Sequence, residues 1–225
     1  MTGLLVLTAV ELEARGLARH LGLAPIGGSA WPRFAGGAVE IVALGLGAAH
    51  LATRLEMMPA PALVVSAGAC GALAPELAVG ALVVPETVLA PDGRRYATAA
   101  VGGLRRHGML LTTDHVLDTA AAKSRLWLST GALAVDMESF VILGWAASRG
   151  VPALVVRGVS DPAARGVPAD LARVVHDDGR VRSMRAVSAV LARPRALADA
   201  MALRTGTAAA LKTVAAAIGT LARTL

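Results

Sequence analysis

Two apolar segments of this chain each run directly into carboxylates, and this pattern constrains the fold more than any other feature. Residues 132–135 are followed by Asp136 and Glu138, and residues 153–156 lead to Asp161. In open α/β sheets, the carboxyl ends of parallel strands form the crevice that holds ligands. The two segments therefore predict neighbouring strands whose ends bring carboxylates together in one polar site.

Apolar runs and segments with helical spacing alternate along the whole chain, which predicts one α/β layer sandwich. The expected strands are residues 4–10, 39–44, 62–67, 81–84, 109–112, 132–135 and 153–156. The expected helices are residues 11–21, 48–57, 119–126, 139–150, 183–191 and 194–221.

The composition is typical of one large domain. The chain has 225 residues, of which 55% are hydrophobic and 17% are charged, and this length allows a sizeable core. Residues 57–75 form the longest uncharged stretch, but prolines and glycines interrupt it, so we do not expect a membrane span there. A single cysteine, Cys70, excludes an intrachain disulfide. We expect a cytoplasmic protein.

The positive charge is concentrated in the last third of the chain. The net charge is +6, and residues 151–225 carry 11 Lys+Arg against 5 Asp+Glu. Basic amphipathic helices bind anionic membrane surfaces, so a peripheral membrane contact through these helices is one interpretation. A basic helix that simply packs on the sheet is the other. Aromatic residues make up only 3% of the chain, which disfavours nucleic acid as a partner.

Two glycine-rich segments follow expected strands. Residues 45–50 lack the third glycine of a dinucleotide-binding fingerprint, so we expect a tight strand-to-helix turn. Small residues at 68–73 would let backbone N–H groups approach a ligand closely, although a plain turn fits the same pattern. The five histidines are scattered without the spacing of metal ligands, and we expect neither a metal nor a cofactor.

Three separated motifs follow one another along the chain. The first is residues 8–13 (Thr-Ala-Val-Glu-Leu-Glu), and the second is the 68–73 segment. The third is a pair of segments, 136–139 (Asp-Met-Glu-Ser) and 157–161 (Arg-Gly-Val-Ser-Asp). Together they resemble the nucleoside phosphorylase and nucleosidase superfamily, especially nucleosidases that cleave adenine from adenosyl compounds. The resemblance implies a single-domain three-layer sandwich around a mixed, partly barrel-like sheet. We expect a catalytic domain at 1–170, a basic helical extension at 171–225 packed on or beside it, and a homodimer.

The resemblance assigns roles to nine residues. Glu138 would accept hydrogen bonds from the ribose hydroxyls, and Met137 would pack against the sugar. Asp161, supported by Ser160, would donate a proton or a hydrogen bond to the purine N7 as the base leaves. Glu13 would activate the attacking water. The other residues expected to contact the nucleoside are Gly68, Ala69, Val116 and Leu117.

Each of the three carboxylates also has a simpler interpretation. Glu138 could complement the macrodipole of a helix that begins beside it. Asp161, which precedes Pro162, could be a turn residue. Glu13 could lie on a solvated helix face. Cys70 could be a nucleophile, but a lone cysteine beside glycine at a strand end is more typical of a small packed residue.

Departures from the superfamily pattern favour hydrolysis over phosphorolysis. The resembling phosphorylases hold phosphate with arginines, one of them just before the glycine-rich segment, where this chain has Ser66. Glu13 is present instead, and a carboxylate would repel phosphate. Ala69 replaces a hydroxyl residue that is common in relatives. Residues 114–117 lack the aromatic that stacks on the base, which leaves an aliphatic slot.

The later part of the chain narrows the expected substrate. Residues 130–135, 178–180 and 191–194, followed by an Ala/Leu-rich tail, resemble the hopanoid-associated branch of the superfamily. The resemblance implies removal of adenine from adenosylhopane to give ribosylhopane, with the connection between residues 85 and 109 leaving the 5′ side of the ribose open. The alternatives are a methylthioadenosine/adenosylhomocysteine nucleosidase, a phosphate-dependent phosphorylase, and a nucleoside-binding protein without activity.

Overall fold

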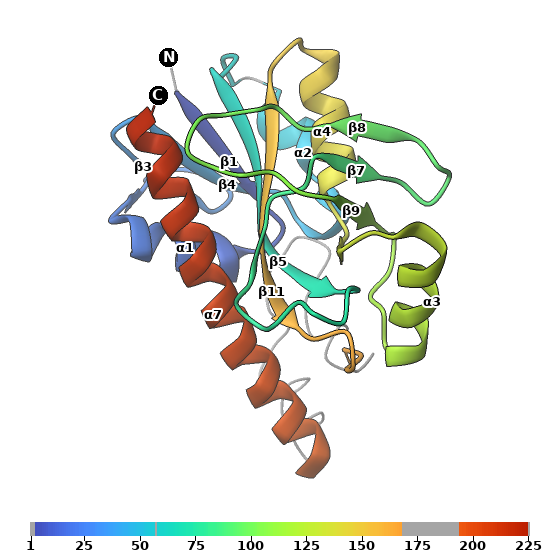
Figure 1. Ribbon diagram of the computed structural model, residues 1–225. Helices are drawn as coiled ribbons and strands as arrows, with labels where there is room; N and C mark the ends of the chain where they lie inside the picture. The colour runs from blue at the N-terminus through green and yellow to red at the C-terminus, as the bar shows by residue number, and fades with distance from the viewer. Residues whose placement is uncertain (1–2, 57, 168–193, 225) are drawn as a thin grey trace.

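A mixed sheet of eleven strands forms the centre of the molecule in the computed structural model, which describes residues 3–56, 58–167 and 194–224 (Figure 1). The strands are β1 (Leu4–Thr8), β2 (Ala24–Pro25), β3 (Arg33–Gly36), β4 (Val39–Ala43), β5 (Leu63–Ala72), β6 (Leu82–Val83), β7 (Thr87–Leu89), β8 (Arg95–Ala97), β9 (Met109–Thr112), β10 (Ala134–Asp136) and β11 (Ala153–Asp161). The helices are α1 (Glu11–Leu21), the 3-10 turn η1 (Leu46–Ala48), α2 (Leu51–Leu55), α3 (Ala120–Thr130), α4 (Ser139–Ser148) and α7 (Pro194–Thr224).

Strand β5 is the branch point of the sheet. The main order is β2-β3-β4-β1-β5-β10-β9-β7-β8, and β11 pairs with β5 and β6 outside this path. The first half of β5 pairs in parallel with β1, its last residues pair antiparallel with β10, and β11 runs parallel along its length. Because β5 pairs with three strands, the sheet curves back on itself around β5. The mixed, partly barrel-like sheet predicted from the sequence is therefore confirmed.

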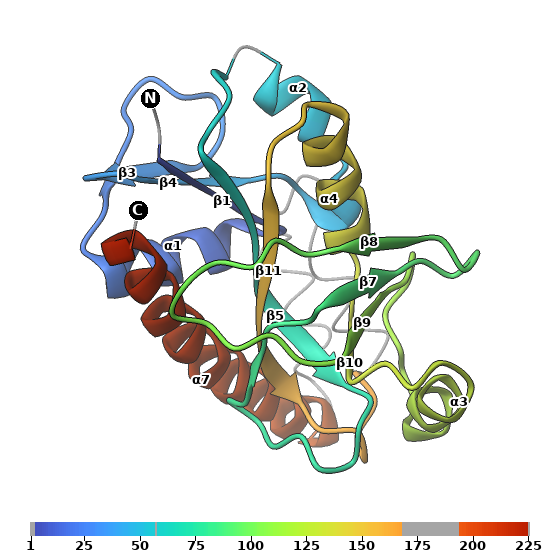
Figure 2. The same ribbon diagram turned by 45° about the horizontal axis from the view of Figure 1, so that its top comes forward.

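Helices cover both faces of the sheet. Helices α1 and α7 lie on one face, and α2 and α4 lie on the other (Figure 2). In β1, Leu4 and Val6 belong to the cluster under α1 and α7, whereas Leu5 and Leu7 belong to the cluster under α2 and α4. A strand covered on both faces is apolar throughout, because alternate side chains enter two separate cores. This confirms the three-layer α/β sandwich.

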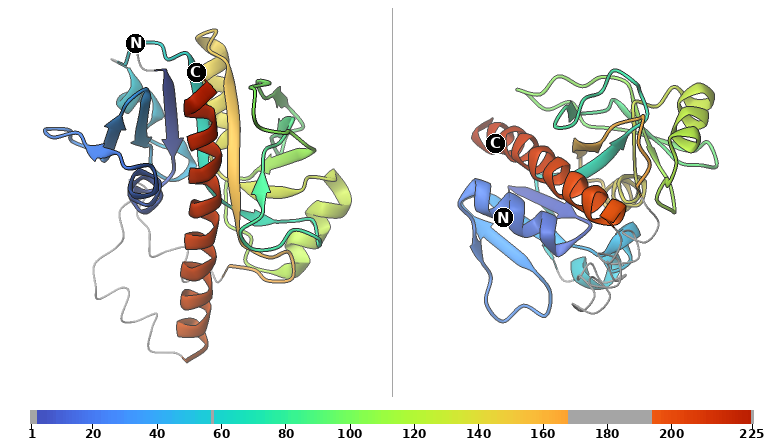
Figure 3. Two further views of the ribbon diagram at one scale, coloured as in Figure 1. Left: turned by 60° about the vertical axis from the view of Figure 1, so that its left-hand side comes forward. Right: turned by 90° about the horizontal axis from the view of Figure 1, so that it is seen from below.

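Helix α7 is part of this core. Figure 3 shows it lying lengthwise beside β11. A Cβ atom at Gly158 of β11 would lie 2.5 Å from the carbonyl oxygen of Ala210, so glycine is what allows the helix backbone to approach the strand. Val214 and Ile218 are completely buried in the cluster that also contains residues of β1, β5 and β11. The C-terminal helix therefore stabilises the sheet that carries the site.

The burial of α7 corrects part of the membrane interpretation. The helix expected at 194–221 would offer lipid its apolar residues, yet four of these are each 5% exposed or less: Leu211, Val214, Ile218 and Leu221. Any membrane contact of the tail must therefore use other residues, such as Met201, which is 61% exposed. Within residues 3–56, 58–167 and 194–224, no helix combines the length and the apolar character needed to cross a bilayer. The helix expected at 183–191 lies outside the described residues, and the domain boundary near residue 170 stays a prediction.

Strand pairing decides two local points. Of the two interpretations of the glycine-rich segment after residue 67, the plain turn was wrong, because β5 continues through Ala72 and this part pairs with β10 and β11. The connection between residues 85 and 109, where no strand was predicted, contains strands β7 and β8, which form an antiparallel pair. Glycine and short polar runs favour turns locally, but pairing with neighbouring strands decides the outcome.

The position of α7 gives a test of stability. Ile218→Ala should lower the free energy of unfolding by about 2–5 kcal/mol, because it leaves a cavity in the shared core. Met201→Ala, on the exposed part of the same helix, should change it by about 0.5 kcal/mol or less. Urea unfolding followed by circular dichroism measures both. Equally small losses in the two variants would contradict the placement of α7 in the core.

Candidate active site

A cavity of about 270 Å³ lies where strands β9, β10 and β11 end. The segment after β1, the 113–117 loop, α3 and α7 complete its walls. The carboxyl ends of strands are the expected place for a ligand site in an α/β sheet, but the ends that meet here come from two parallel pairs, β9 with β10 and β5 with β11, and β10 is antiparallel to β5. The expectation that the two acidic strand ends belong to neighbouring strands was therefore wrong, since β5 lies between them. The structure brings eight of the nine predicted residues to this cavity: Glu13, Ala69, Val116, Leu117, Met137, Glu138, Ser160 and Asp161.

A completely buried arginine, Arg157 of β11, organises the acidic side of the site. Its Nη2 atom lies 2.8 Å from Asp136 Oδ2 and 3.6 Å from Glu138 Oε2. The same nitrogen donates hydrogen bonds to Ser66 Oγ at 2.9 Å and Ser139 Oγ at 3.2 Å. A buried charge is tolerated only when it is paired in this way. An arginine inside an otherwise apolar strand is the sequence signal for such a network, and no role was predicted for it.

Backbone N–H groups fix the carboxylate of Glu13. Its Oε2 atom accepts from Ala9 and Val10 at 3.1 and 3.3 Å, which caps the start of α1. Its Oε1 atom accepts from the backbone of Ala69 at 2.8 Å. Burial raises the pKa of Glu13 above its usual 4.5, while the Arg157 guanidinium and these N–H groups act in the opposite direction. Glu13 is 6% exposed, so the solvated-face interpretation is wrong.

The glycines of β5 make room for charged side chains. Gly68, the one predicted residue that does not line the cavity, has φ +150°, and a Cβ there would lie 2.5 Å from Glu13 Oε1 and 2.8 Å from Arg157 Nη1. At Gly71 a Cβ would lie 3.0 Å from Asp161 Oδ2. Larger residues at these positions would displace the carboxylates, so the small-residue run is required by the site itself.

Glu138 points towards the turn after β4 and not along its own helix. Its Oε1 atom accepts a hydrogen bond from the backbone of Gly47 at 3.0 Å, and its side chain does not cap α4. Asp136 occupies that position instead, because its Oδ2 atom accepts from Ser139 N–H at 3.2 Å. Burial raises the pKa of Glu138 to about 7, with Asp136 adding to the shift and Arg157 opposing it. Glu138 is the N-cap residue of α4, at the helix start that the macrodipole interpretation expected, but its side chain forms no capping hydrogen bond. Its bond to Gly47 makes the 45–50 turn part of the site.

Asp161 forms a buried salt bridge with Lys123 of α3, which sequence reasoning missed. Lys123 Nζ also donates to the carbonyl oxygen of Pro162 at 3.1 Å, and Ser160 Oγ donates to Asp161 Oδ1 at 2.6 Å. A register shift between β11 and β5 lets the consecutive residues Ser160 and Asp161 both reach the cavity. Lys123 lies three positions before Leu126, on the same side of α3. A lysine on the apolar face of a helix was the sequence signal that could have indicated a buried salt bridge.

The remaining wall is mostly apolar, apart from Thr113, His115 and Thr207. Val116 and Leu117 line it together with Met137 and Leu203, and the described lining residues include no Phe, Tyr or Trp. Cys70 also lines the cavity, but burial raises the pKa of its thiol well above the ordinary value, which argues against a thiolate nucleophile. In the part of the chain that the structure describes, no group of three or more His, Cys, Asp and Glu could hold a metal ion.

Comparison with known proteins defines the class. A sequence profile of the Phosphorylase superfamily matches residues 4–107 and 101–193, so the chain belongs to this superfamily. Futalosine hydrolase from Streptomyces coelicolor is 38% identical over 128 residues, which are 44% of this chain and 54% of that protein. A 5′-methylthioadenosine/S-adenosylhomocysteine nucleosidase from Mycobacterium tuberculosis is 36% identical over 83 residues, which are 35% of this chain and 32% of that protein.

Solved structures agree on the fold. A 5′-methylthioadenosine/S-adenosylhomocysteine nucleosidase from Neisseria meningitidis, in complex with methylthio-immucillin-A, superposes with a TM-score of 0.70 over 100% of both chains at 14% identity. At this identity the likeness establishes the architecture alone. The sequence match spans about half of the futalosine hydrolase and a third of the nucleosidase. Activity and substrate therefore rest on the chemistry of the site.

The environment of Glu138 predicts a pH-dependent stability. A glutamate in the unfolded chain ionises near 4.5, whereas Glu138 in the folded protein has a pKa of about 7. Between these values the folded state holds the extra proton, so stability falls as the pH rises. Glu138→Gln removes this dependence. Its free energy of unfolding relative to wild type should increase between about pH 4.5 and pH 7 and then level off.

Urea unfolding at a series of pH values measures the effect. Glu76→Gln is the matched control, because Glu76 is exposed and its variant should follow the wild type at every pH. A difference between Glu138→Gln and wild type that stays constant with pH would show that Glu138 ionises normally in the folded protein.

Proposed function

We propose that the protein is an N-glycosidase that hydrolyses the bond between ribose and the purine of an adenosyl nucleoside. One observation carries the proposal: four buried carboxylates line a single cavity, and three of them, Glu13, Glu138 and Asp161, have different surroundings, while the fourth, Asp136, is paired with Arg157. The superfamily and the names of the matching relatives support the same reaction class. Glu13, Glu138 and Asp161 each have a separate task in glycosidic cleavage.

The sugar and the water are bound on the Glu13 and Glu138 side. A carboxylate can accept two hydrogen bonds from a diol, which suits Glu138 to the ribose hydroxyls. Met137 lies next to it and would pack against the sugar ring. Glu13, held by three N–H groups, would take a proton from the water that attacks C1′. Asp161 and Ser160 would then lie against the leaving purine.

The electrostatics of the cavity favour water over phosphate as the nucleophile. Arg157 is paired with Asp136, lies near Glu138 and is not among the described residues that line the cavity, so it is not placed to hold an oxyanion there. Glu13 lies on the same side, and the carboxylates there outnumber the cation. Ser66, at the position of a phosphate-binding arginine in the phosphorylases that the chain resembles, is completely buried and bonded to Arg157.

The 5′ substituent is the finer part of the proposal. Leu12 and Leu46 line the cavity, and Leu12 is 59% exposed, which gives the mouth an apolar edge. None of the described lining residues comes from 85–109, so the exit expected there is not supported. We propose an apolar 5′ group. Adenosylhopane is the substrate that the resemblance to the hopanoid-associated branch implies, and methylthioadenosine is the alternative. A homodimer and contact with the membrane surface stay part of this proposal.

A substrate panel tests this preference. Adenine release should have a higher kcat/KM for adenosylhopane in detergent and for methylthioadenosine than for adenosylhomocysteine. The reason is that the charged amino-acid group of adenosylhomocysteine would have to lose water at an apolar mouth. Liquid chromatography of released adenine measures all three reactions. A preference for adenosylhomocysteine would contradict an apolar 5′ site, and no release from any of them would refute the nucleosidase.

Replacement of Glu13 tests the activation of water. Glu13→Gln loses the base and keeps only one of the two oxygens that accept backbone N–H bonds, so kcat for adenine release should fall by about a hundredfold or more. Glu11→Gln in the same helix changes a surface glutamate that pairs with Arg15, and it should leave kcat unchanged. Near-normal turnover of Glu13→Gln would remove Glu13 from catalysis.

A further inference from the structure

Lys123 is a buried ammonium group that reaches the cavity from the base side. Only 1% of its side chain is exposed, and it is the buried residue of α3. It lines the same cavity as Glu13, Glu138 and Asp161. Removal of an ammonium group from water is costly, and its salt bridge with Asp161 offsets that cost.

The hydrogen bonds of Lys123 leave one donor for a ligand. A lysine side chain has three N–H donors and no acceptor. Asp161 Oδ2 and the carbonyl oxygen of Pro162 accept two of them, and no other acceptor among the described residues bonds to Nζ. A Cβ at Gly71 would lie 3.3 Å from Nζ, so this glycine keeps the pair accessible from the cavity.

The pair offers a donor and an acceptor side by side. An ionised carboxylate only accepts hydrogen bonds, and each of its oxygens has two lone pairs. Ser160 occupies one site on Asp161 Oδ1 and Lys123 one on Oδ2, so acceptor capacity remains. The imidazole-side edge of adenine presents an acceptor, N7, beside a donor, the N6 amino group. A 6-oxopurine presents two acceptors, and its oxygen would oppose the carboxylate.

We infer that Lys123 is a catalytic residue that gives the proton to N7 of the departing adenine, while Asp161 accepts from the N6 amino group. The inference deepens the proposed nucleosidase function and rests on it. It transfers the proton donation predicted for Asp161 to its lysine partner, because an aspartate that accepts from Lys123 and Ser160 has the hydrogen bonds of a carboxylate.

The proton and electron movements balance. The C1′–N9 bond breaks, its electron pair moves onto the purine ring, and N7 takes a proton from Lys123 Nζ. Water bonds to C1′ and gives its proton to Glu13. The neutral amine of Lys123 regains a proton from solvent after adenine leaves, and Glu13 loses one. The net reaction consumes one nucleoside and one water and yields neutral adenine and the free sugar.

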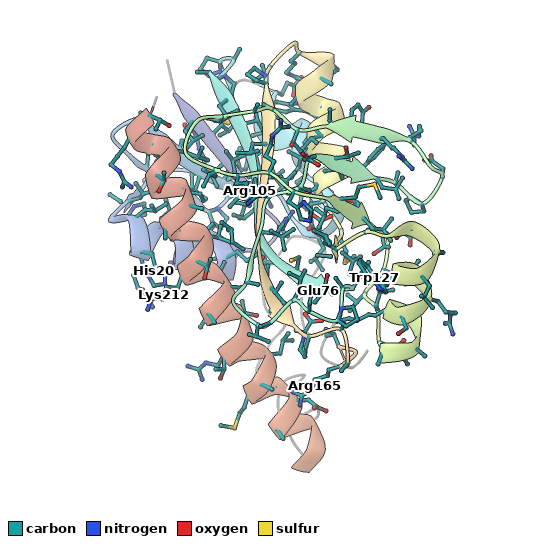
Figure 4. All side chains as sticks on the ribbon, viewed as in Figure 1. His20, Glu76, Arg105, Trp127, Arg165 and Lys212 are labelled. Carbon is teal, nitrogen blue, oxygen red and sulfur yellow. The ribbon has the colours of Figure 1, made fainter. Side chains whose placement is uncertain are left out.

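Two ribosides with different leaving groups separate a proton donor from a structural residue. Lys123→Met keeps most of the side-chain volume and removes the ammonium group. It should lower kcat for methylthioadenosine by about a hundredfold or more, but change kcat for 4-nitrophenyl β-D-ribofuranoside little, because nitrophenolate leaves without a proton. Lys212→Met is the control, since Lys212 is the other lysine of the chain and lies exposed on α7 (Figure 4). It should leave both rates unchanged.

A binding measurement does not depend on turnover. Titration calorimetry should show that the wild type binds adenine at least about tenfold more tightly than 7-deazaadenine, in which a C–H group replaces N7. Lys123→Met should bind the two bases with equal affinity. A wild-type circular dichroism spectrum and a cooperative urea transition confirm that the variant is folded, although its midpoint should be lower because Asp161 loses its partner.

The outcomes separate the two proposals. If Lys123→Met loses the same factor on both ribosides, or if the wild type binds adenine and 7-deazaadenine equally, Lys123 does not donate to N7, although the nucleosidase function stands. If the wild type releases no base from any riboside, the proposed function fails. The comparison of the two bases then still decides whether Lys123 contacts N7.

Discussion

The buried guanidinium of Arg157 is the interaction on which the rest of the site depends. It lies in β11, against the centre of β5, and its charge compensates Asp136 and Glu138 while also opposing the rise in the pKa of Glu13 that burial causes. Removal of one partner from a buried ion pair typically costs about 3–5 kcal/mol, because the other charges stay behind without compensation. The network therefore couples the stability of the sheet to the position of the carboxylates.

Two buried cations hold the carboxylates of the site. Arg157 has no solvent exposure and pairs with Asp136 beside Glu138, behind the part of the cavity that we propose for the sugar and the water. Lys123 lines the cavity and pairs with Asp161, and we propose that its third donor serves the base. The glycines of β5 permit both arrangements, since Gly68 lies against Glu13 and Gly71 against the Asp161 pair. A nucleosidase needs separate groups for the leaving base and for the attacking water, because the two require opposite proton transfers.

Strand ends were predictable from the sequence, and long-range pairings were not. The runs before Asp136 and Asp161 are apolar enough to mark buried strands, and each is followed by a carboxylate at the site. The way in which these strand ends meet did not follow from the pattern: β10 and β11 do not pair with each other, and both end beside Gly71 of β5, which β10 meets antiparallel and β11 parallel. The salt bridge of Lys123 joins residues 38 positions apart, and periodicity in one helix does not reveal its partner. The Gly68 segment stayed open between a turn and a close approach to a ligand, because local preference favours a turn, whereas pairing with β11 extends the strand.

The identity of the nucleophile decides most directly between this site and that of a phosphorylase. Phosphorus NMR of a reaction with methylthioadenosine and an equal amount of inorganic phosphate follows the phosphate while chromatography follows adenine. If Glu13 activates water, one equivalent of adenine is released and the phosphate signal stays unchanged. A sugar 1-phosphate that forms in step with adenine would contradict the hydrolytic site built around Arg157 and Glu13.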